Sequence, residues 1–191
     1  DGSYSLLDRL SRDVVTGHDW PRRLKWLRAA GVGSVIASDV PSGLPGLVPL
    51  YTEGRFGPAA TLFRLAEPLP GVRRLSRVRG SRSVSEAVAL VDDPSFDPAT
   101  DGVVAGRPPA GTDVHEADPG AAARVAAEGP DLLVVETSGK TPALLLVDRS
   151  FTSRVTATVN GSQAAVYAAQ LHLVGVAVPE GTARVVVFLA P

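Results

Sequence analysis

The chain has 191 residues, enough for one large domain or two small ones, and its 45% apolar and 20% charged residues are typical of a globular protein, not a disordered one. Its formal net charge of −1 gives no overall field that would attract nucleic acid or an anionic membrane. Because the chain contains no cysteine, disulfides, thiolate metal sites and a cysteine nucleophile are excluded.

The chain also contains no methionine, so we expect a processed protein or a piece cut from a longer one. No apolar run reaches the ~18 residues that a membrane helix needs. Any export or anchoring signal is therefore expected outside this sequence.

The N-terminal third begins with two predicted helices. Leucines spaced i, i+1, i+4 predict a short amphipathic helix over residues 3–12. Asp19 is a good N-cap, and Pro21 falls in the first turn, where its missing N–H costs nothing. We therefore predict a second helix that ends at Gly31, followed by a strand over residues 33–38.

The middle of the chain alternates short apolar runs with breaks that contain Gly and Pro. These runs predict strands at residues 47–51, 61–65, 72–79 and 102–105. Ser83 to Glu86 has the Ser-x-x-Glu pattern of a capping box, which predicts a helix over residues 84–91. Residues 106–120 are rich in Pro and Gly, and we place a domain boundary or an exposed loop there.

The final stretch, from Asp131 to Pro191, consists of short β-branched or leucine-rich runs. Its strongest hairpin signal is Asn160-Gly161, because both central residues of a type I′ turn need a positive φ. We predict strands at residues 131–138, 142–148, 154–159, 162–170, 171–178 and 182–189.

Together these elements predict an α+β chain that is mainly β. We expect a smaller α/β N-terminal part over residues 1–110 and an antiparallel, jelly-roll-like β-sandwich over residues 120–191. Whether the two parts share one sheet is left open, because residues 72–79 and 102–105 could join the sheet of the sandwich.

Ser138-Gly-Lys-Thr141 resembles the end of a phosphate-binding P-loop. That motif needs a glycine where Val134 stands and a helix afterwards, whereas Pro142 opens another strand. We therefore predict a hairpin turn here.

Aspartates at positions 92, 93, 97 and 101 lie close enough in sequence to supply oxygen ligands to a hard cation such as calcium. The ligand order and central glycine of an EF-hand are missing, and Asp-Pro pairs commonly form turns, so a turn is favoured. The histidines are far apart and no Gly-x-Ser-x-Gly motif is present. We predict no catalytic residue, no metal ligand and no cofactor.

Arg73, Arg77 and Arg79 belong to a local basic run and share one face of the predicted strand over residues 72–79. Because arginine binds phosphate bidentately, they are candidates to hold lipid or polyprenyl phosphates. A solvated sheet face with ion pairs is the favoured interpretation. Nucleic acid is not expected as a partner, since no aromatic residues interleave with the run.

Trp20, Trp26 and Tyr167 are candidates for a platform on which a sugar ring could stack. Scattered aromatic residues more often serve core or edge packing. The sequence does not place these three side chains together.

The order of several segments is more informative than any single motif. These segments are Trp26–Ile36, Thr61–Pro70, Ser85–Pro98, Leu144–Phe151, Ala157–Gly161, Leu173–Gly181 and Val185–Pro191. In this order, and most specifically toward the C-terminus, the chain resembles the soluble extracytoplasmic region of the YfhO family of bacterial polytopic membrane proteins. The family usually has Pro-Gly-Trp before an Asp-Gly hairpin, whereas this chain has Ser153, Arg154 and Val155 before Asn-Gly.

The resemblance implies a domain on the extracytoplasmic side of the bacterial cell membrane, between transmembrane helices of a multi-pass protein. The parent proteins look like lipid-linked-sugar glycosyltransferases, whose catalytic acid belongs to a loop among the membrane helices that is not in this chain, so no catalytic residue is carried over. The implied partners are the membrane-embedded remainder of the same polypeptide and an envelope carbohydrate or polyprenyl-phosphate sugar. The alternative is a structural or protein-interaction module of the cell envelope that binds no sugar.

Overall fold

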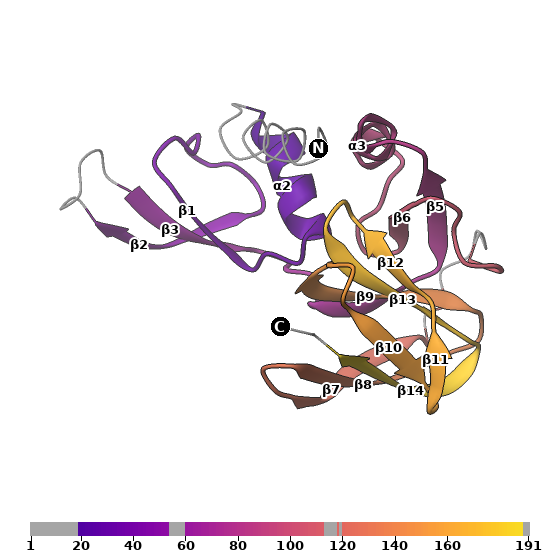
Figure 1. Cartoon of the computed structure of the whole chain (residues 1–191). Coiled ribbons are helices and arrows are strands. Elements are labelled where there is room, and N and C mark those ends of the chain that lie inside the picture. Colours follow the sequence, from indigo (N-terminus) through magenta and orange to yellow (C-terminus); the bar gives the residue numbers. More distant parts are fainter. Residues whose placement is uncertain (1–18, 54–59, 113–117, 119, 189–191) are drawn as a thin grey trace. The chain divides into compact units, whose positions relative to one another are not determined.

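The structure, a computed structural model, describes residues 19–53, 60–112, 118 and 120–188 (Figure 1). The described residues form two compact units, residues 19–70 and residues 71–188. Strands predominate and two helices are present among them, so the predicted α+β, mainly β class is confirmed.

In the smaller unit, helix α2 (Trp20–Ala29) begins where the capping pattern predicts. Oδ1 of Asp19 accepts a hydrogen bond from the backbone N–H of Arg22 at 3.1 Å, and a proline lies in the first turn. Gly31 follows the helix with a φ of 74°, a conformation that glycine adopts without steric cost.

The strands predicted in this unit are also present. They are β1 (Ser34–Ala37), β2 (Leu47–Glu53) and β3 (Ala60–Leu65). They form an antiparallel sheet in the order β1-β3-β2. The helix predicted over residues 3–12 and the turn predicted between β2 and β3 lie outside the described residues.

The larger unit contains two sheets. One has the order β11-β10-β14-β8-β7, with all of its pairs antiparallel. Its strands are β7 (Ala122–Glu128), β8 (Leu132–Gly139), β10 (Thr156–Val159), β11 (Ser162–Ala164) and β14 (Gly181–Phe188).

The second sheet has the order β4-β9-β13-β12-β6-β5 and is antiparallel except for the parallel pair β5–β6. Its strands are β4 (Val72–Leu75), β5 (Arg77–Ser81), β6 (Asp101–Ala105), β9 (Ala143–Ser150), β12 (Val166–Ala169) and β13 (Leu173–Val178). Figure 1 shows the layer of β7, β8, β14 and β10 facing the layer that contains β9 and β13.

The second sheet explains where the chain divides. β4 and β6 pair with β9 and β12 from the C-terminal half of the chain, and β5 joins the sheet through β6. Along the chain, the division between the two compact units therefore falls between Pro70 and Gly71, and the boundary predicted at residues 110–120 falls inside the larger unit.

Strand β9 is buried on both faces, which accounts for its continuous apolar run. Leu145 and Val147 pack in the main core between the two sheets. Leu144 and Leu146 point to the opposite face and pack in a second core. A strand covered on both faces needs no alternation of apolar and polar residues.

The single strand predicted over residues 72–79 is wrong, because it is interrupted at Ser76. The backbone N–H groups of Ser76 and Arg77 both donate to the carbonyl of Thr100, at 3.1 and 3.2 Å. β4 and β5 then lie at opposite ends of the strand order. In a flat six-stranded sheet the two edge strands would be about 24 Å apart. Ser76 alone connects β4 to β5, so the sheet must curl to bring its two edges together. The second core fills the inside of this curled sheet.

The hairpin predicted at residues 138–141 is also wrong. β8 pairs with β7 and β14, whereas β9 pairs with β4 and β13, so this turn carries the chain from one sheet to the other. The turn at Asn160-Gly161 is a true hairpin between β10 and β11, with φ values of 50° and 82°. The single strand predicted over residues 162–170 is wrong, because β11 and β12 belong to different sheets.

Candidate functional site

The parallel pair β5–β6 is joined by helix α3 (Val84–Asp92), which makes a β-α-β unit inside a mainly antiparallel fold. The helix begins as predicted: Oγ of Ser83 accepts from Glu86 N at 3.1 Å, and the Glu86 carboxylate accepts from Arg82 N at 2.7 Å. Because β5 and β6 run in the same direction, their carboxyl ends, at Ser81 and Ala105, meet beside the first turn of α3. Ligands commonly bind at such an edge in parallel sheets.

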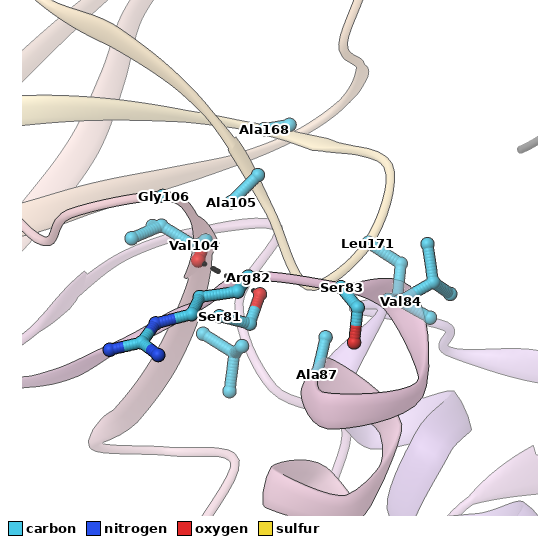
Figure 2. A pocket seen from close by; sticks show the side chains of 11 residues that line it. Ser81, Arg82, Ser83, Val84, Ala87, Val104, Ala105, Gly106, Ala168 and Leu171 are labelled. Carbon is cyan, nitrogen blue, oxygen red and sulfur yellow. Dashed lines mark hydrogen bonds between the residues drawn. The ribbon is translucent and has the colours of Figure 1, made fainter.

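A cavity of about 300 Å³ opens at this edge (Figure 2). Its lining comes from the loop before α3, the first turn of α3, the end of β6, and the β12–β13 connection. The lining residues are Ser81, Arg82, Ser83, Val84, Ala87, Val103, Val104, Ala105, Gly106, Ala168 and Leu171. Most of this surface is apolar, and its volume lies at the lower end of the range of small-molecule pockets.

The cavity has two hydroxyl groups, both partly engaged by the fold. Oγ of Ser81 donates to the carbonyl of Val104 at 3.1 Å, which Figure 2 marks with a dashed line. Oγ of Ser83 accepts the capping hydrogen bond of the helix. A hydroxyl has one proton and two lone pairs, so Ser81 can still accept a hydrogen bond and Ser83 can still donate one.

Arg82 supplies the positive charge of the cavity. Its side chain is exposed, and within the part of the chain that the structure describes its guanidinium makes no ion pair or hydrogen bond. Its backbone N–H is occupied by Glu86. This side chain is therefore available to an anion at the cavity.

The β12–β13 connection forms one wall of the cavity in a strained conformation. Gln170 and Leu171 have φ values of 47° and 76°, which for a leucine is rare. Gln170 is anchored because its backbone N–H donates to Val103 O at 2.9 Å and its side-chain Nε2 donates to Asp101 O at 3.1 Å. This anchoring holds Leu171 at the cavity wall against a strain of about 1–3 kcal/mol.

The three arginines singled out in the sequence are used by the fold. Arg73 is 6% exposed and donates to the carbonyl of Pro98. Burial lowers the pKa of Arg73 to about 10, and the charge of Asp148 opposes this shift. Arg73 lies on β4 and the other two on β5, so they do not share one strand face.

Arg77 holds the buried carboxylate of Asp101 with two hydrogen bonds of 2.6 Å each, and this contact raises the pKa of Arg77. Arg79 donates to Leu90 O at 3.4 Å and lies 5.7 Å from the ring centre of Phe96. These contacts fix the ends of β5 and α3. Arg82, which follows β5, lines the cavity, and Figure 2 shows its guanidinium at the rim, directed outward.

A fourth arginine, Arg74, joins the two sheets. Its guanidinium donates to Thr137 Oγ1 at 3.1 Å, to Thr141 O at 2.6 Å and to Pro179 O at 3.3 Å. Gly139 leaves room for it, since a Cβ there would lie 2.7 Å from Arg74 Nε. These contacts brace the connections that run from one sheet to the other.

The aromatic candidates do not form a platform. Trp20 and Trp26 are 2% and 8% exposed inside the smaller unit, and the Arg23 guanidinium lies 3.8 Å above the Trp20 ring. Tyr167 belongs to the larger unit and packs against its second core. Neither tryptophan offers an exposed ring face to a sugar.

The aspartates near residue 100 are engaged in turns and an ion pair. Oδ1 of Asp93 accepts from the backbone and hydroxyl of Ser95, and Oδ1 of Asp97 accepts from the N–H of Ala99. In the part of the chain that the structure describes, no group of three potential ligands is placed to hold a metal ion.

Comparisons with protein-family models, with curated proteins and with solved structures found no match to this chain. Across the described residues, no helix is both long and apolar enough to cross a bilayer. The site therefore rests on its own geometry.

Sequence reasoning missed this cavity although two signals for it were present. A capping box followed by an apolar helix and then a short apolar strand is the pattern of a β-α-β unit. The second signal is the position of Arg82, between the end of β5 and the N-cap Ser83. A residue at this position lies at the carboxyl edge of the strand.

Proposed function

We propose that this chain is a non-catalytic binding domain and that the cavity at the carboxyl edge of the β5–α3–β6 unit holds its ligand. One observation carries the proposal: an apolar cavity, two hydroxyls with remaining hydrogen-bonding capacity and the uncommitted guanidinium of Arg82 meet at one edge. Such a set binds and orients a ligand. Its residues do not include a nucleophile with an adjacent base.

In its more specific form the proposal takes the setting from the resemblance to the YfhO family. The domain then lies on the extracytoplasmic side of a bacterial cell membrane, attached to the membrane-embedded remainder of the same polypeptide. There it contacts envelope carbohydrate or a lipid-linked sugar, while chemistry is left to the membrane part. The parent reading frame should then encode apolar spans on both sides of this chain, and their absence would overturn this setting.

Binding is tested by titrating the isotope-labelled chain with monosaccharides and disaccharides of bacterial envelopes and with N-acetylglucosamine 1-phosphate. We expect amide shifts to move at Ser83, Gly106 and Leu171. Ala105→Trp, placed at an exposed site on the cavity wall, should abolish these changes without unfolding the chain. If no sugar shifts any amide at millimolar concentration, the carbohydrate assignment falls.

A second candidate, a protein-interaction module, is favoured by the sheet of the smaller unit. Ile36 and Tyr51 are 72% and 61% exposed, and both lie opposite Leu62 on β3, so the three form one cross-strand row. Leu50 is 51% exposed beside this row. If a second copy of the chain covers the row, sedimentation will show a dimer that Ile36→Asp converts to a monomer.

A further inference from the structure

We infer that the cavity takes an anionic amphiphile, with a short hydrocarbon segment inside the cavity and the anionic head group at Arg82. The inference rests on the proposed binding function and names the chemical class of the ligand. It follows from a division of the lining into an apolar interior and a positively charged rim.

The interior is apolar on every element that contributes to it. Val84 and Ala87 come from α3, Val103 and Val104 from β6, and Leu171 from the turn between β12 and β13. No aromatic side chain is among the lining residues, so the stacking surface that a sugar ring commonly uses is missing. A hydrocarbon segment needs only such a surface, because its transfer from water is itself favourable.

The rim favours a negative charge. Arg82 extends from the loop before α3, and Figure 2 shows its guanidinium pointing away from Leu171 at the other side of the cavity. The Ser83 hydroxyl lies next in sequence and retains a proton to donate. Figure 2 shows the Ser83 hydroxyl and the Arg82 guanidinium directed to opposite sides, so the guanidinium is the group that matches the oxygens of a phosphate or a carboxylate.

Glu86 limits how the head group is held. Its carboxylate accepts from the backbone N–H of Arg82 and neutralises part of the positive end of α3. The head group is therefore held by the side chain of Arg82 and not by the backbone amides of the helix. Loss of Arg82 alone should then remove most of the preference for a charged ligand.

The test is a calorimetric titration of the chain with butyl, hexyl and octyl phosphate. Separate titrations with n-octanol and inorganic phosphate measure binding of the hydrocarbon segment and of the head group alone. Each added methylene that enters the cavity should tighten binding about threefold to fourfold. Inorganic phosphate should bind at least tenfold more weakly than octyl phosphate. Octanoate in place of octyl phosphate shows whether the head group must be a phosphate.

Two variants assign the two halves of the ligand. Arg82→Gln should weaken octyl phosphate about tenfold and leave n-octanol unchanged. Arg184→Gln is the matched control, because Arg184 is an exposed arginine of the same unit on β14, which contributes nothing to the cavity lining. Ala105→Trp should weaken octyl phosphate and n-octanol alike.

The outcomes separate this inference from the function it rests on. Affinity that does not rise with chain length, or that is equally lost in Arg184→Gln, overturns the amphiphile. If sugars bind in the cavity and the alkyl phosphates do not, the amphiphile falls and the binding domain stands. If no probe binds and Ala105→Trp changes nothing, both fall.

Discussion

The main core between the two sheets and the carboxyl edge of the β5–α3–β6 unit lie in the same compact unit but are built differently. In the core, antiparallel strands from both sheets interdigitate, and residues such as Leu145 and Val185 are fully buried. At the edge, two parallel strands end side by side and the helix between them leaves a cavity. Side chains of the antiparallel strands fill the space between the two sheets. A parallel pair with a crossover helix instead leaves an open end, where polar loop residues gather.

The largest effect is expected in the core. Leu145→Ala removes a fully buried side chain of β9 and should cost about 3 kcal/mol of unfolding free energy, measured by urea denaturation. Val125→Ala, at a residue 43% exposed on the edge strand β7, should cost less than about 1 kcal/mol. Equal losses would show that β9 does not run through the centre of the unit.

The next effect is expected where the edge is tied to the sheet. Asp101→Asn leaves Arg77 without its carboxylate partner and should cost about 2 kcal/mol, since the carboxylate is fully buried and Arg77 is partly exposed. Glu136→Gln breaks the exposed pair with Arg124 and should cost less than about 0.5 kcal/mol. Denaturant midpoints of the two variants measure the contrast, and a neutral Asp101→Asn would contradict it.

A smaller effect is expected where Arg74 braces the two sheets. Arg74→Gln loses the hydrogen bonds to the carbonyls of Thr141 and Pro179 and should cost about 1–2 kcal/mol. Arg184→Gln removes the same charge from an exposed site and should leave stability unchanged. Thermal unfolding of both variants checks this, and a match between them would mean that the brace contributes nothing.

The smallest effect concerns Asp118, near the connection from β8 to β9. Its pKa is lowered chiefly by the hydrogen bond from Lys140 N; desolvation opposes this shift, and the hydrogen bond from Gly120 N adds to it. A lowered folded pKa adds stability that is present above the unfolded pKa and lost as the pH falls through the folded value. Carboxyl NMR should show Asp118 titrating below 3.8, its ordinary pKa.

Asp118→Asn supplies the control for that titration. The variant should be less stable than the wild type at neutral pH, and the difference should shrink in acid. If the stability difference between the two proteins stays constant with pH, the negative charge of Asp118 does not strengthen the hydrogen bonds from the two N–H groups.

Local features were predictable because each depends on a few neighbouring residues. Asp19 and Ser83 cap their helices through contacts three residues away, and Asn160-Gly161 forms its turn through its own two φ angles. The alternation of Ala183, Val185 and Val187 likewise marks the buried face of β14. Interactions within three residues, or with a period of two, can be read from a single sequence.

The candidate site was not predictable, because its parts come from distant segments. Arg82 and Leu171 are separated by most of the larger unit and line the same cavity only through the strand order of the six-stranded sheet. The sequence also could not distinguish Arg82 from Arg73 or Arg77. Only tertiary pairing shows that Arg77 is bound to Asp101, 24 positions later.

The sequence by itself determined most of the strands, the two helix starts and the mainly β class, since period and capping are local. Only the tertiary structure decided that Ser76 splits one apolar run between two ends of a curled sheet, and that residues 138–141 pass between sheets. Both depend on which strands pair, and pairing partners are chosen by burial summed over the whole unit, not by the run itself. The same pairing brings Arg82, Ala105 and Leu171 to one cavity.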